Sequence, residues 1–236
     1  MMKGMTVIAI LFWLLYLALS AANIAGLRRN GDASRLHRRT KPLLCPVLLA
    51  AYLYTASAAG ASVIWLIPAG LLGGFLGDTF LLNAERYFLP GLFSFLLGHL
   101  CYAAAFLLQI AASGTGIPVS VVFLGLVGYV LYILLAALPV LRAAERELRI
   151  GCSLYMAVIF LMSYSSLLMT AACGMRFLPA FLGSLFFIIS DTLLSRQIVL
   201  GRSGRGVMET YLPAQALIAI GMILGNLPPT TAFLAF

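Results

Sequence analysis

Two aspartates stand inside apolar stretches of this sequence, and their surroundings are alike. Asp78 lies in GDTFLL, residues 77–82, and Asp191 lies in SDTLLS, residues 190–195. Of the seven acidic residues, only these two are well inside apolar segments. Burying an unpaired carboxylate is costly, so a carboxylate in such a segment needs an explanation. Two carboxyl groups in one low-dielectric cavity can divide the work of a general acid and a general base, and we expect these two to form one site.

The composition indicates the environment that must hold these carboxylates. Of the 236 residues, 63% are hydrophobic and 9% are charged, whereas soluble proteins have about 45–50% apolar and about 25% charged residues. The apolar residues gather into runs of roughly 20, the length that a helix needs to cross a bilayer. The basic residues lie in short connections between these runs, as in cytoplasmic loops. We therefore expect the lipid bilayer as surroundings and no nucleic-acid partner.

Eight spans are predicted, which makes the chain an all-α integral membrane protein, an eight-transmembrane-helix bundle in a single membrane domain (1–236). Thirteen of the fifteen Lys and Arg residues fall in alternate connections, starting with the first. By the positive-inside rule these connections are cytoplasmic, and both termini lie on the non-cytoplasmic side. The spans cover approximately residues 5–26, 43–60, 62–82, 88–112, 117–141, 151–172, 177–200 and 209–232.

The similar surroundings of the two aspartates suggest an internal repeat. Asp78 falls in the third predicted span and Asp191 in the seventh, so each is in the third span of a four-helix half. Because four is an even number, both halves would cross the membrane in the same sense, as two parallel halves with residues 1–114 and 115–236. The alternative is a chance match between short apolar strings.

Other polar residues are predicted at a depth compatible with the two carboxylates. At 1.5 Å per residue, the predicted spans put the side chains of Lys41, His99, Tyr155, Tyr211 and Gln215 in the cytoplasmic half of the bilayer, which fits one polar cavity open to the cytoplasm. Tyr102 shares a helical face with His99, and Ser190 directly precedes Asp191. The candidate supporting residues are Lys41, His99, Tyr102, Tyr155, Ser190, Tyr211 and Gln215.

Each of these residues also has a purely structural interpretation. Asp78, near a span end, could extend to water or cap a neighbouring helix, and His99 could be a hydrogen-bonded packing residue. The tyrosines and Gln215 could join helices by hydrogen bonds. The four cysteines lack the C-x-x-C spacing and stand in or beside apolar runs, so we expect neither a metal site nor a disulfide, and no cofactor.

Short motifs in six of the predicted spans occur together in a known family. They are Lys41-Pro42-Leu43; Gly77-Asp78-x-x-Leu81; Phe88, Gly91, Phe95, His99, Tyr102 and Phe106 at regular spacing; Tyr155-x-x-x-Ile159-x-x-Met162; Gly183-x-x-x-Phe187-x-x-Ser190-Asp191-x-x-Leu194; and Tyr211-x-x-x-Gln215. In these motifs the sequence resembles the YhhN-type lysoplasmalogenase family of multispanning membrane hydrolases. The resemblance implies cleavage of the vinyl ether bond of a lysoplasmalogen into a fatty aldehyde and a glycerophospho-headgroup.

That reaction suits a pair of carboxyl groups. Protonation of the β-carbon of a vinyl ether generates an oxocarbenium ion, to which water adds before the hemiacetal collapses. One protonated acid and one carboxylate are needed, as in glycoside hydrolysis. We expect Asp78 and Asp191 to be this pair, without choosing which is the acid. His99 and Tyr155 would position water or tune the pair, and Lys41 would meet the headgroup phosphate.

Two other classes of protein fit the same residues. A proton-coupled transporter of a small molecule or lipid would also use paired intramembrane carboxylates, and internal repeats are common among transporters. A structural or assembly subunit would have little need for two buried aspartates. We expect the hydrolase, in the plasma membrane of a bacterium, with its site opening to the cytoplasmic side and with no protein partner.

Overall fold

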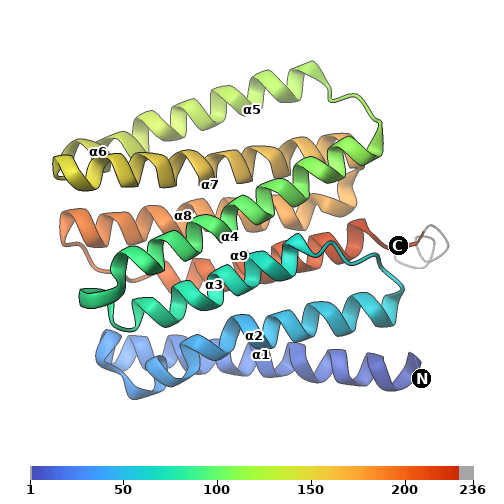
Figure 1. Ribbon diagram of the computed structural model, residues 1–236, viewed down its shortest axis with the longest axis horizontal. Helices are drawn as coiled ribbons and strands as arrows, with labels where there is room; N and C mark the ends of the chain where they lie inside the picture. Colours follow the sequence, from blue (N-terminus) through green and yellow to red (C-terminus); the bar gives the residue numbers. More distant parts are fainter. Residues whose placement is uncertain (1, 229–236) are drawn as a thin grey trace. The chain divides into compact units, whose positions relative to one another are not determined.

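The computed structural model describes residues 2–228, except for the side chains of residues 2–4, 147 and 148, and this part of the chain is helical and contains no strand. Seven helical runs in it are long and apolar enough to cross a membrane, which confirms the prediction of an all-helical integral membrane protein. The helices (Figure 1) are α1 (Met2–Asn30), η1 (Gly31–Ala33), α2 (Arg35–Ala59), α3 (Leu66–Leu81), α4 (Ala84–Ser113), α5 (Val119–Tyr132), η2 (Ile133–Ala137), α6 (Leu138–Ala143), α7 (Arg146–Cys173), η3 (Met175–Phe177), α8 (Leu178–Leu200) and α9 (Val207–Gly225).

The helix at the predicted third span is apolar but shorter than the seven runs that are long enough to cross a membrane. Its helix, α3, has 16 residues rather than the 21 of the predicted segment 62–82, and at 1.5 Å per residue it is about 24 Å long. A bilayer core is about 30 Å thick. The helix starts late: residues 61–64 are not helical, and within this stretch the backbone N–H of Ser62 donates to the carbonyl of Asn226 (3.2 Å). The count of eight spans therefore stays a prediction.

Two helix ends differ from the prediction for local reasons. Helix α2 begins at Arg35 rather than at residue 43, because Ser34 caps it by accepting a hydrogen bond from the backbone N–H of His37 (3.4 Å). Helix α9 ends at Gly225, whereas the last predicted span reached residue 232, and residues 229–232 lie outside the described part.

Helix α4 has a kink at Tyr87 (φ −121°, ψ 26°). The kink precedes Pro90, which lacks the backbone N–H of a regular helical turn.

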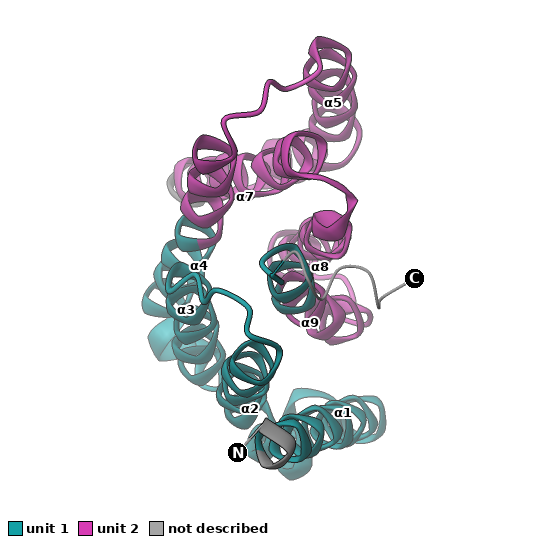
Figure 2. Ribbon diagram, turned by 90° about the vertical axis from the view of Figure 1, so that its right-hand side faces the viewer, with its two compact units in different colours: residues 1–101, 219–236 teal, residues 102–218 magenta. Residues whose placement is uncertain are grey.

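The chain forms two compact units (Figure 2). Unit 1 contains residues 1–101 and 219–236, and unit 2 contains residues 102–218, so α4 and α9 contribute to both. These borders differ from those of the predicted repeat halves, because the end of the chain belongs to unit 1. The internal repeat stays a prediction.

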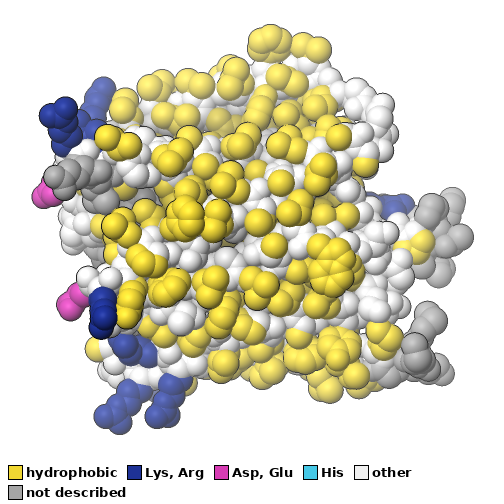
Figure 3. Space-filling model, in the orientation of Figure 1, with side chains coloured by type: hydrophobic (Ala, Val, Ile, Leu, Met, Phe, Trp, Pro, Cys, Tyr) yellow, Lys and Arg dark blue, Asp and Glu magenta, His cyan; other side chains and the backbone are white. Residues whose placement is uncertain are grey.

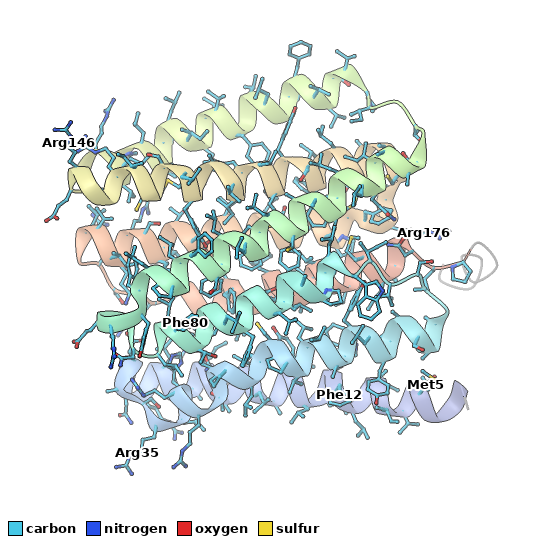
Figure 4. The ribbon with its side chains drawn as sticks, viewed as in Figure 1. Met5, Phe12, Arg35, Phe80, Arg146 and Arg176 are labelled. Atoms are coloured by element: carbon cyan, nitrogen blue, oxygen red, sulfur yellow. The ribbon has the colours of Figure 1, made fainter. Side chains whose placement is uncertain are left out.

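Within each unit, charged side chains gather at helix ends while apolar side chains cover the helix surfaces (Figure 3). Leu124 and Leu135 are 72% and 75% exposed, as expected of side chains that face lipid. In unit 1, Arg35 lies at the end opposite to Met5, and in unit 2, Arg146 and Arg176 lie at opposite ends of the α7 region (Figure 4). The direction in which the termini face stays a prediction.

Helices α3 and α4 approach each other closely through glycines. A Cβ atom added at Gly73 would lie 2.8 Å from the carbonyl oxygen of Ser94 and 2.9 Å from the Cα atom of Gly98. Small residues at such crossings let backbones come together, which is a common way of packing membrane helices. This crossing holds α3, the helix of Asp78, against α4, the helix of His99.

We expect Gly73→Val to lower the melting temperature of the detergent-solubilised protein, because the new side chain meets backbone atoms that cannot rotate away. Overpacking of this kind costs about 1–3 kcal/mol, which corresponds to several degrees for a chain of this size. The control is Gly128→Val in α5, where no atom of the described residues would lie within 4 Å of an added Cβ atom. Equal melting temperatures for the two variants would refute the close crossing.

Candidate active site

Asp78 is buried in unit 1 beside two side chains of α2. Its side chain is 3% exposed, and Lys41 Nζ lies 3.8 Å from its Oδ1. The Cys45 thiol donates to Oδ2 at an Sγ–Oδ2 distance of 3.8 Å. Lys41 and Cys45 are four residues apart, so they share one face of the helix. The structure thus brings together the two predicted site residues Lys41 and Asp78, and adds Cys45.

A buried polar network holds the beginning of α2, and sequence reasoning missed it. Asn23 of α1 is fully buried and donates from Nδ2 to the carbonyl of His37 (3.2 Å) and to Thr40 Oγ1 (2.9 Å). The His37 ring Nδ1 lies 3.2 Å from Asn23 Oδ1. Because Lys41 directly follows Thr40, these hydrogen bonds fix the turn of α2 from which Lys41 extends.

His99 is 2% exposed on α4, in the same unit as Asp78. One turn before it, the ring of Phe95 packs on Gly77, the neighbour of Asp78, where an added Cβ atom would lie 2.5 Å from ring atoms. Residues four apart share a helical face, so His99 lies on the face of α4 that packs against α3. Its role in catalysis stays a prediction.

Asp191 lies in unit 2, where it accepts a hydrogen bond from another predicted site residue. The hydroxyl of Tyr155, from α7, donates to Asp191 Oδ2 at 2.9 Å. Tyr155 is 7% exposed while Asp191 is of intermediate exposure, so this hydrogen bond is partly buried. A small cavity adjoins the pair, lined by Ala137, Tyr155, Met156, Ile159, Phe160, Ile188, Asp191, Thr192 and Ser195.

Three further predicted residues form a cluster of their own in unit 2. The hydroxyl of Tyr102 donates to Gln215 Oε1 (2.6 Å), and Gln215 Nε2 donates to the hydroxyl of Tyr211 (3.2 Å). The ring of Phe187 lies against both tyrosines, with centroid distances of 6.4 Å to Tyr102 and 5.5 Å to Tyr211. This cluster joins α4, α8 and α9 inside the unit.

Ser190 is placed differently from its neighbour Asp191. Its Oγ is buried and donates to the carbonyl of Val207 (3.1 Å), at the first residue of α9. The hydroxyl therefore joins α8 to α9. This hydrogen bond does not favour a direct contact between Ser190 and the substrate, and that contact stays a prediction.

The polar side chains beside the two aspartates differ in chemical type. Groups of three or more His, Cys, Asp or Glu side chains that could hold a metal ion do not occur in the described part of the chain. The four cysteines are free thiols. The contacts described above include an ammonium and a thiol at Asp78, and a phenol hydroxyl at Asp191.

These features define a helical multi-pass membrane protein with a hydrogen-bonded aspartate in each unit, buried at Asp78 and partly buried at Asp191. The family model for the YhhN family matches residues 36–222. Over 170 residues the chain is 33% identical to lysoplasmalogenase TMEM86A of Homo sapiens and 30% identical to lysoplasmalogenase TMEM86A of Bos taurus, with 69% of this chain and 67% of each relative covered. The chain belongs to the YhhN family. No solved structure matches it significantly.

Proposed function

We propose that this protein is a lysoplasmalogenase-like hydrolase that cleaves the vinyl ether bond of a membrane lysolipid. Relatives named lysoplasmalogenase support the reaction class. The observation that carries the proposal for this chain is that both intramembrane aspartates lie in the matched segment and each has a polar partner, Lys41 for Asp78 and Tyr155 for Asp191.

We propose that both carboxyl groups take part in the reaction. One transfers its proton to the β-carbon of the vinyl ether, which leaves an oxocarbenium ion at the carbon bonded to oxygen. The other accepts a proton from the water that adds to that carbon. The hemiacetal then breaks its bond to the glycerol oxygen, which takes up a proton, and the aldehyde is released.

The basic side chains suit the headgroup of such a substrate. A lysoplasmalogen carries a phosphate diester at the end opposite to its alkenyl chain. Lys41 is 14% exposed, so its ammonium group can reach both Asp78 and the surface. We propose that Lys41 contacts this phosphate, that the site opens to the cytoplasmic side, and that the host membrane is a bacterial inner membrane.

The test is a lipid panel with purified protein in detergent. We expect a fatty aldehyde from alkenyl lysolipids only, because a saturated alkyl ether lacks the double bond that the proton must add to, and an acyl lysolipid would yield a fatty acid. In D₂O, with the aldehyde reduced as it forms, the product should carry one deuterium at the carbon next to the former carbonyl. Release of fatty acid from the acyl lysolipid, or intact alkenyl lipid, would rule out this function; a transporter would leave the lipid intact.

A further inference from the structure

The cavity beside Asp191 has the size and the lining of a binding site for one water molecule. The centre of a water molecule can occupy a volume of about 10 Å³ in it. By this measure, a cavity for one water needs roughly 10–15 Å³. A lysolipid chain is far too large for it. A water also needs two to four polar partners, and four lining residues have polar side chains: Tyr155, Asp191, Thr192 and Ser195.

The Tyr155 and Asp191 side chains at the cavity can accept hydrogen bonds from a water molecule. The Tyr155 hydroxyl uses its proton on Asp191, so its oxygen can accept from a water. Thr192 Oγ1 donates to the carbonyl of Ile188 (2.7 Å). The Tyr132 hydroxyl is also hydrogen-bonded to Thr192. A water in the cavity could therefore donate to the Asp191 carboxylate, the acceptor that a nucleophilic water needs.

An irregular helical segment contributes its last residue, Ala137, to the lining. Residues Ile133–Ala137 form a π-helix between α5 and α6, and such segments are frequent at functional sites. Tyr132, directly before this segment, is the residue bonded to Thr192. Ala137, its last residue, is 2% exposed and packs with Met156 at the cavity. The small side chain of Ala137 therefore limits the size of the cavity without filling it.

We propose that this cavity binds the water that is consumed in the reaction, and that Asp191 is the base that accepts its proton. This inference rests on the proposed hydrolysis for the chemical step, but not for the binding of water. In that step the water oxygen bonds to the oxocarbenium carbon and one water proton passes to Asp191. Asp191 then gives that proton to the glycerol oxygen when the hemiacetal breaks and returns to its ionised form. The hemiacetal hydroxyl releases its own proton as the aldehyde forms, and a proton from solvent restores the acid that protonated the β-carbon.

The variant that tests the site is Ala137→Val, because two added methyl groups would occupy the space of the water. We expect an experimental structure of the wild type to contain one ordered water within hydrogen-bond distance of Asp191, and the variant to lack it. Aldehyde formation should fall by roughly 10²-fold, the usual contribution of a general base, with the KM for the lipid unchanged. The control is Ala136→Val, the same substitution on the neighbouring residue, which does not line the cavity.

A second measurement needs no variant. In dilute methanol, a site for one water should exclude the alcohol, so the wild type should form aldehyde and no mixed methyl acetal of the lipid. A methyl acetal in proportion to the methanol present, a dry cavity in the wild-type structure, or wild-type rates in a folded Ala137→Val protein would each overturn the proposal. Absence of aldehyde from the wild type is a different result, because it removes the proposed function whether or not the water is present.

Discussion

Asp191→Asn is expected to lower aldehyde release from an alkenyl lysolipid by roughly 10²–10⁴-fold, the range of general acid–base catalysis. Asparagine has nearly the same shape, and its amide oxygen can accept the hydrogen bond that the Tyr155 hydroxyl now donates at 2.9 Å. It cannot take a proton from water. The protein should therefore stay folded while turnover is lost, as measured by initial rates beside the melting temperature and gel-filtration profile in detergent.

Two comparisons separate this effect from a general disturbance. Asp32→Asn makes the same chemical change at an exposed residue of η1 and should leave the rate unchanged. Tyr155→Phe removes one hydrogen bond to the carboxylate, an interaction worth about 1.5–3 kcal/mol with a charged partner, so its rate should lie between those of the wild type and Asp191→Asn. Wild-type turnover by folded Asp191→Asn protein would eliminate Asp191 from the mechanism.

The helical, membrane-spanning architecture could be predicted from the sequence because its cause is local. A run of apolar residues that must satisfy its own backbone hydrogen bonds in lipid has little choice but to form a helix. The ends of the helices could not be predicted as well, since they depend on particular hydrogen bonds. The cap at Ser34 starts α2 within a predicted cytoplasmic loop, and the non-helical residues 61–64, where Ser62 bonds to Asn226, precede a short α3.

The polar partners were predictable only in part. Depth along the predicted spans put Lys41 and Tyr155 on the same side of the membrane as the two aspartates, but it did not pair them; the structure has Lys41 beside Asp78 and Tyr155 bonded to Asp191. Cys45 was interpreted as an apolar core residue, although its spacing of four from Lys41 was a usable signal.

Other features of the site depend on tertiary contacts that the sequence does not reveal. The hydrogen bonds of Asn23 were missed because its partner, His37, was assigned to a loop. The cavity beside Asp191 needs a π-helical turn, which hydrophobic periodicity does not predict.

Asp78→Asn is expected to lower turnover as much as Asp191→Asn does, because it removes the acid of the reaction instead of the base. If Asp191 takes the proton of water, Asp78 is the carboxyl group left to protonate the β-carbon, and an amide cannot do so. The variant should remain folded, because Lys41 is 14% exposed and its ammonium can extend to water when its partner is lost. Initial rates and the melting temperature in detergent check both statements, and a folded variant with wild-type turnover would contradict the assignment.

Lys41→Met distinguishes the two partners proposed for Lys41. Loss of a phosphate contact should raise the KM for the lysolipid with a smaller effect on kcat, whereas loss of a contact important only to Asp78 should lower kcat alone. The double variant Lys41→Met/Asp78→Asn then measures the coupling between the two side chains, which for groups in contact is about 0.5–3 kcal/mol in the free energy of unfolding. Strictly additive effects on stability would mean that the Nζ–Oδ1 distance of 3.8 Å does not reflect an ion pair, and that Lys41 acts on the headgroup alone.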